Sequence, residues 1–118
     1  MRIARGSTFE VTFGLPHEYD ISDAKAVEIT FTQFDKIIFT KTLEDVEIEE
    51  DGRHINLTLS QEDTLKFVGN GSAKMQMRIL TADDEAIVQH PITEIYVIDI
   101  LKDGVIGDER DIPSDPES

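Results

Sequence analysis

The chain has 118 residues, no cysteine and a formal net charge of -14 at pH 7. This length suits one domain with a core large enough to fold without disulfides or a structural metal. The absence of cysteine excludes disulfides, thiolate metal sites and a cysteine nucleophile. The charge opposes binding to phosphate backbones and anionic membranes, so we expect neither a nucleic-acid nor a membrane partner. No stretch has the length of a membrane span or of a signal peptide, which predicts a protein made in the cytoplasm.

The first half of the chain alternates apolar and polar residues, a pattern that predicts strands with one buried face. Phe9, Val11 and Phe13 alternate with polar residues until Pro16 ends the run. Residues 33–36 suit a hairpin turn. A later run of acids that alternate with apolar residues predicts a short edge strand, whose charged outer row discourages pairing with other chains. The strands predicted in this half cover residues 7–15, 27–32, 37–42 and 43–51.

The middle of the chain combines two alternating strands with a helical turn between them. Ser60 can cap a helix over about residues 60–67, because its hydroxyl can accept a backbone N–H and acidic residues follow in the first turn. We expect Leu65 to plug the end of the fold and Phe67 to begin the exit towards a glycine-rich reversal. This order is typical of the E–F crossing of immunoglobulin-like sandwiches, where the chain passes between sheets. The flanking strands cover residues 53–59 and 73–81.

The last third begins with strand-like residues over 86–100, which Pro91 interrupts, so a bulge or an edge position is expected there. In total, about seven strands and one short helical turn predict an all-β, immunoglobulin-like antiparallel β-sandwich. We expect this domain to cover residues 1–106. Residues 107–118 are rich in Asp, Glu, Pro and Ser and lack the burial needed to offset ordering entropy. They predict an acidic, disordered C-terminal tail.

Two acidic turns, at residues 44–45 and 83–85, could in principle offer carboxylate oxygens to calcium. Neither has the fixed spacing and central glycine of a calcium-binding loop, which favours solvated turns. The histidines also lack a zinc-type spacing; they are His17, His54 and His90. We therefore predict no metal site and no cofactor.

Three residues superficially match the members of a catalytic triad, namely Ser60, His54 and Asp63. Ser60 is better explained as a helix cap, and no nucleophile-elbow motif surrounds it. We therefore predict no catalytic residue and no enzymatic activity. The chain also has no tryptophan and only two tyrosines, which weakens the case for a carbohydrate-binding module.

Five stretches stand out by their order and spacing along residues 5–106. They are RGSTFEVTFGLP at 5–16, TQ at 32–33, LTLSQEDTLKF at 57–67, MQMRILT at 75–81 and LKDGVI at 101–106. Together they resemble the small prophage-encoded proteins of low-GC Gram-positive bacteria found among tail and baseplate genes. Those proteins are related in kind to the N-terminal immunoglobulin-like domain of phage baseplate upper proteins. The chain departs from them in its acidic tail and in the acid run at 47–51.

The resemblance implies a non-enzymatic structural or assembly module of a phage or prophage tail or baseplate, acting through protein–protein contacts. Its partners would be other virion proteins and a second copy of the chain, and its location would be the virion. The alternative is a carbohydrate- or cell-surface-binding β-sandwich module assisted by calcium. Polar residues on otherwise β-branched faces are where specific hydrogen bonds to a partner could form. The interaction residues predicted in this way are Gln33, Gln76 and Arg78.

Overall fold

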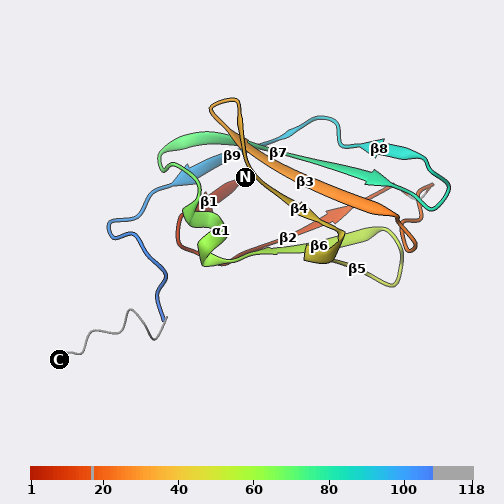
Figure 1. Cartoon of the computed structure of the whole chain (residues 1–118), viewed down its shortest axis with the longest axis horizontal. Coiled ribbons are helices and arrows are strands. Elements are labelled where there is room, and N and C mark those ends of the chain that lie inside the picture. Colours follow the sequence, from red (N-terminus) through yellow and green to blue (C-terminus); the bar gives the residue numbers. More distant parts are fainter. Residues whose placement is uncertain (17, 108–118) are drawn as a thin grey trace.

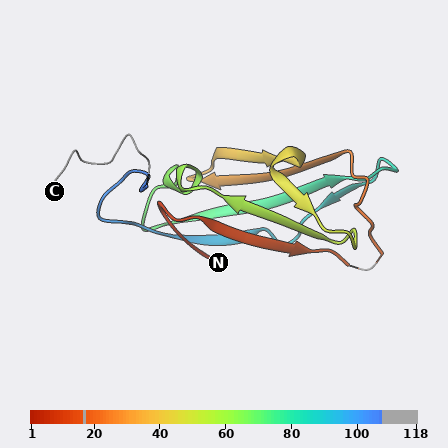
Figure 2. The ribbon, with the colours of Figure 1, turned by 90° about the horizontal axis from the view of Figure 1, so that it is seen from below.

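The computed structural model describes residues 1–16 and 18–107, so His17 and, apart from Gly107, the predicted tail at 107–118 lie outside the described residues. Within this part, nine strands form two sheets that pack face to face (Figure 1, Figure 2). The larger sheet runs β1-β9-β7-β3-β4 with β8 beside β7, and the smaller runs β2-β6-β5. The strands are β1 Arg2–Ala4, β2 Phe9–Gly14, β3 Ala26–Gln33, β4 Lys36–Thr42, β5 Val46–Ile48, β6 His54–Leu59, β7 Gly71–Leu80, β8 Ala86–Val88 and β9 Thr93–Ile98.

The predicted fold class is confirmed: the protein is an immunoglobulin-like β-sandwich. The strand orders β9-β7-β3-β4 and β2-β6-β5 correspond to the G-F-C-C′ and B-E-D orders of a variable-type domain. All strand pairs are antiparallel except β1 with β9, which are parallel. Two more strands are present than the sequence predicts, because β1 was not foreseen and the strand around Pro91 is split in two.

The predicted helical turn is also confirmed, as α1 (Gln61–Leu65) at the crossing from β6 to β7. The backbone N–H of Asp63 donates to Ser60 Oγ at 3.1 Å, and the N–H of Ser60 donates to Asp63 Oδ2 at 3.0 Å. This reciprocal cap explains why the helix begins where it does. Since α1 has only five residues, the described part of the chain contains no helix that could cross a membrane.

The core lies between the sheets, and its α1 end is closed by three aromatic rings. Phe31 stacks on Phe39 with 4.7 Å between centroids, and Phe67 meets both rings edge-on at 6.0 and 5.6 Å. Phe67 is 1% exposed, whereas Leu65 is only half-buried. The prediction that Leu65 plugs this end and Phe67 leaves it was therefore wrong. The reason is that α1 ends at Leu65, so Phe67 turns back into the core.

Two further segments differ from the sequence-based expectation. Residues 43–45 form a 3-10 turn, η1 (Leu43–Asp45), rather than the start of an edge strand. The Asp45 carboxylate accepts the Thr42 N–H at 2.8 Å and so favours a turn there. At Pro91 the predicted interruption is present, because the four residues 89–92 lie opposite only two residues of β7. The side chain of Gln89 fills this bulge by accepting the Met77 N–H at 3.0 Å.

A candidate interaction surface

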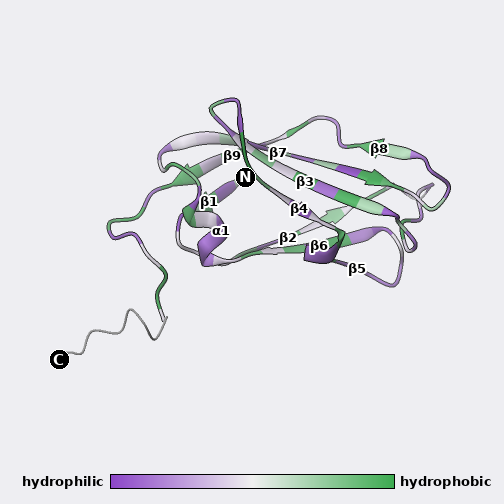
Figure 3. Cartoon of the chain, viewed as in Figure 1, coloured by the Kyte–Doolittle hydropathy of each residue, from purple (hydrophilic) through white to green (hydrophobic). Residues whose placement is uncertain are grey.

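The outer face of the six-stranded sheet carries five of the ten large apolar side chains that the described part of the chain exposes. We call its outward side chains on β1, β3, β4, β7, β8 and β9, together with Ile92, the six-stranded face. By contrast, none of the large exposed apolar residues in the described part of the chain lies on β2, β5 or β6. Figure 3 shows the hydrophobic colour of β8 on this sheet. The exposed apolar members are Ile37 (69% exposed), Val88 (52%), Tyr96 (46%), Ile92 (44%) and Ile98 (37%).

The charges on the two outer faces differ in sign. The outward residues of the six-stranded face include three cations and two anions, a balance of +1, in a chain whose total is -14. On the three-stranded face, formed by the outward side chains of β2, β5 and β6, Glu10 and Glu47 are present without any Lys or Arg. Of the two outer sheet faces, the six-stranded face is therefore the one that repels an acidic partner less. Its charged members are Arg2, Lys74, Arg78, Glu28 and Glu94.

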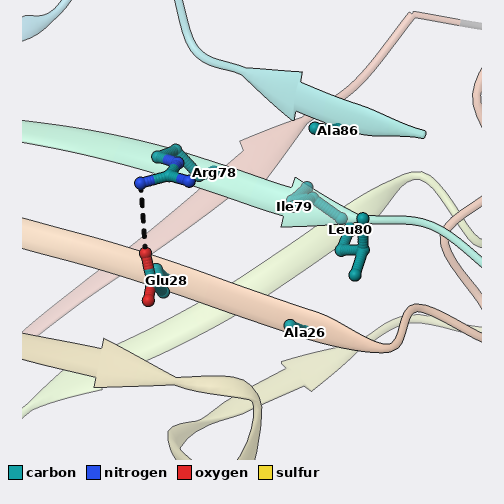
Figure 4. A pocket seen from close by; sticks show the side chains of 6 residues that line it. All are labelled: Ala26, Glu28, Arg78, Ile79, Leu80 and Ala86. Atoms are coloured by element: carbon teal, nitrogen blue, oxygen red, sulfur yellow. Dashed lines mark ion pairs between the residues drawn. The ribbon is translucent and has the colours of Figure 1, made fainter. Parts of the chain in front are cut away.

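A shallow depression of about 200 Å³ lies on this face where β3, β7 and β8 meet (Figure 4). Glu28 and Arg78 face each other at one end of it, with 3.6 Å between Oε1 and Nη1. Both side chains are more than half exposed, so their mutual attraction is screened by water and contributes little to stability. Each can exchange its present partner for one on another molecule. Ala26, Leu80 and Ala86 form the apolar floor and rim.

The structure separates the three interaction residues that the sequence predicts. Gln76 and Arg78 project from β7 onto the six-stranded face, and Gln76 Nε2 donates to the Gln89 carbonyl at 3.1 Å. Gln33 was expected to meet a partner, but it is only 5% exposed, and its amide is engaged with the backbone of Val68. Gln33 is the last residue of β3, and the alternation of the strand points its side chain inwards, which is the physical reason for this correction.

Sequence reasoning missed the apolar members of the six-stranded face. A signal for two of them exists, since the alternation fails in the continuous apolar runs at 37–39 and 86–88. In such a run, at least one residue must project outwards on a strand. Ile37 and Val88 are those residues. No comparable signal marks Tyr96. Glu94 and Ile98 lie two residues away on either side, one charged and one apolar, and an aromatic residue between them suits either face of a strand.

One group of side chains has the spacing to approach a metal ion, and it is not in either acidic turn considered from the sequence. Ligand atoms of Glu49, Asp51 and His54 all lie within 4.8 Å of one another. Each already has a partner: His54 Nδ1 lies 2.5 Å from Asp51 Oδ2, and Asn56 Nδ2 donates to Glu49 at 3.1 Å. The pKa of Asp51 is lowered, chiefly because it accepts the Arg53 N–H. These bonds stabilise the loop between β5 and β6, and they explain why the three side chains lie close together.

The residues that superficially match a triad are not arranged as one. Ser60 and His54 flank opposite ends of β6, and the Ser60 hydroxyl caps α1. Asp63 pairs instead with Lys41, whose Nζ lies 2.9 Å from Oδ2.

His90 is exposed beside Pro91. A second cavity of about 280 Å³ opens between β2 and β8; among the described residues that line it, Tyr19 is the one phenylalanine, tyrosine or tryptophan.

Comparison with known proteins adds a fold-level likeness. No protein-family model matches the sequence, and no curated protein matches it. The chain is similar to CopC from Methylosinus trichosporium OB3b, with 14% identity, a TM-score of 0.47 and 87% of each chain covered. It is also similar to murine CRIg, with 9% identity, a TM-score of 0.39, and 86% of this chain and 92% of that chain covered. At these values the likeness carries no argument about function.

Proposed function

We propose that this chain is a non-enzymatic protein-binding module of a phage or prophage tail or baseplate, and that it docks through the six-stranded face. One observation supports this docking site. In the described part of the chain, the six-stranded face is the only outer sheet face that carries cations, and it is also the one that carries the exposed apolar side chains. Apolar patches bordered by polar groups are typical of protein interfaces. The phage setting rests on the resemblance of the five stretches to tail and baseplate proteins.

The arrangement of side chains supports binding rather than catalysis. Except for Ile92, the exposed apolar residues of this face stand on strands, which hold them rigidly, so little conformational entropy is lost when a partner covers them. Tyr96, 46% exposed, is the kind of aromatic residue that often dominates binding energy at an interface. The mixed charges of Lys74, Arg78 and Glu28 would orient the partner.

The experiment uses a host strain that carries the gene. Particles are induced and purified, and the chain is sought in them by quantitative mass spectrometry. The gene is then replaced with a Tyr96→Asp version, which places a charge at an exposed aromatic position of the six-stranded face. A Glu10→Arg version on the three-stranded face serves as the control.

We expect the wild type and Glu10→Arg chains in the particles at one fixed ratio to the tail proteins, and the Tyr96→Asp chain to be lost from them. Since Tyr96 projects outwards, the variant should fold, which circular dichroism checks. Absence of the wild-type chain from the particles would refute the phage role. Equal incorporation of all three chains would refute the six-stranded face as the docking site.

A further inference from the structure

The strand register of the six-stranded face contains a self-complementary pattern. Across the boundary between β3 and β7, each outward residue of one strand lies opposite a residue of compatible chemistry on the other. One row joins an acid to a base, one joins an amide to a hydroxyl, one joins an ammonium group to a hydroxyl, and one joins two apolar side chains. The rows are Glu28 with Arg78, Thr30 with Gln76, Thr32 with Lys74, and Ala26 with Leu80.

A two-fold axis converts this pattern within one chain into contacts between two chains. If the axis runs parallel to the strands and between β3 and β7, every β7 residue of one copy lies over the β3 residue of the same row in the other copy. Arg78 of each copy then meets Glu28 of the other, and Gln76 meets Thr30. This arrangement pairs each of the four rows between β3 and β7 with its chemical complement, while on the flanking strands Ile37 of one copy lies over Glu94 of the other.

We propose that the partner on the six-stranded face is a second copy of this chain, bound as a symmetric dimer about that axis. This inference rests on the proposed function and names the occupant of its docking face. The flanking apolar residues Ile37, Val88 and Ile92 leave water when the two faces meet, which drives association. The exposed Glu28–Arg78 pair changes from a contact within one chain to two contacts between chains.

Charge selects this face over the opposite one. Two three-stranded faces would bring Glu10 and Glu47 of both copies together with no Lys or Arg on those strands. Dimerisation through the six-stranded face instead leaves these acids in solvent on the outer sides. The remaining long-range repulsion between two chains of charge -14 is screened over about 10 Å at 0.1 M salt. The dimer should therefore tighten as salt is raised from very low values.

Sedimentation equilibrium of the full chain measures the association. The wild type should give a reversible dimer of the 13.3 kDa chain. Arg78→Glu and Glu28→Arg should each weaken dimerisation about tenfold or more, because like charges then meet twice across the axis. An equimolar mixture of these two variants should regain wild-type affinity as a one-to-one heterodimer, since every crossing then joins an acid to a base. Both variants remain strongly negative, so simple charge neutralisation cannot explain such a recovery.

The controls carry the same charge changes elsewhere on the surface. Lys102→Glu matches Arg78→Glu, and Glu10→Arg matches Glu28→Arg; both should dimerise like the wild type. A wild type that stays monomeric at millimolar concentration would overturn the inference, as would a mixture that fails to recover. Neither result would bear on the particle experiment, where loss of the Tyr96→Asp chain would still support docking of another protein on this face.

Discussion

Gln33 holds Val68 by both of its backbone polar groups. The Val68 N–H donates to Gln33 Oε1 at 2.7 Å, and Gln33 Nε2 donates to the Val68 carbonyl at 2.8 Å. The side-chain amide thus takes the place of a neighbouring strand for one residue of the loop between α1 and β7. Because Phe67 immediately precedes Val68, this clamp also holds the aromatic ring that closes the core.

Gln33→Leu should lower the free energy of unfolding by about 1–3 kcal/mol, because the Val68 N–H and carbonyl lose their partner in a partly buried site. Urea unfolding measures the change. Gln61→Leu is the matched control: Gln61 makes the same two bonds to Ile106, at 2.8 and 3.2 Å, but in an exposed position. Water can replace those bonds, so the control should cost less. An equal cost at both sites would contradict the role of burial.

Asp63 should make the stability depend on acid pH. Burial alone would raise the pKa of Asp63, but hydrogen bonds from the Ser60 N–H and the Lys41 ammonium outweigh it and leave that pKa below its ordinary value. The unfolded chain therefore binds more protons between the two pKa values, and stability falls as the pH falls through them. The contribution is complete above the unfolded pKa of about 4.

Asp63→Asn removes this contribution. The difference in unfolding free energy between the wild type and the variant should be largest near neutral pH and should shrink on acidification to about pH 3, below the unfolded pKa. Urea titrations at a series of pH values measure it. Asp23→Asn, at an exposed turn, also removes one negative charge and is the control; it should change the unfolding free energy little at neutral pH. A difference for Asp63→Asn that does not change with pH would contradict the prediction.

Arg5 links the end of α1 to the segment after β9. Its Nε donates to the Phe67 carbonyl at 2.6 Å, and its Nη1 lies 2.7 Å from Asp103 and 2.8 Å from Asp99. Hydrogen bonds to Asp103 and Asp99 raise the pKa of Arg5, and the bond from Arg5 lowers the pKa of Asp99. Only a guanidinium offers donors in all these directions.

Arg5→Lys should therefore cost about 1–2 kcal/mol of unfolding free energy although it keeps the charge. Hydrogen exchange of the amides that follow α1 should also become faster. Arg2→Lys, at an exposed position on β1, is the control and should leave both measurements unchanged. A fully stable Arg5→Lys protein would show that charge alone, and not the fork of donors, is required.

Gly52 should resist substitution even by alanine. Its φ is +70°, and an added Cβ would overlap the Asp20 carboxylate and lie 2.5 Å from Ser22 Oγ. Gly52→Ala should cost about 1–3 kcal/mol in chemical unfolding, from backbone strain and displacement of this loop. Gly14→Ala is the control, because its Cβ would meet the His54 ring at an ordinary 3.5 Å. If both variants unfold at the same urea concentration, the close approach of Asp20 and Ser22 to Gly52 does not restrict the residue at this position, and the prediction is wrong.

Local signals in the sequence were sufficient to predict most of the strands and the helix cap, although not β1 or the 3-10 turn at 43–45. Alternation with a period of two depends only on which face of a strand is buried, so it appears wherever one sheet covers another. Ser60 with Asp63 specifies the helix start, and the Asp51-Gly52 pair marks a hairpin, through bonds that span three residues or fewer. The sandwich class and the position of its crossing follow from these local features alone.

The tertiary structure alone decided which residues meet across long distances in the chain. β1 has three residues and is paired with β9, more than 90 residues away, so no local pattern could reveal it. Gln33 reads as a polar surface residue until Val68, 35 positions later, is seen against its amide. The six-stranded face likewise depends on strand order: Glu28 opposes Arg78 only because β3 lies beside β7. Alternation reports that a side chain points outwards, but the packing of distant strands decides what lies next to it.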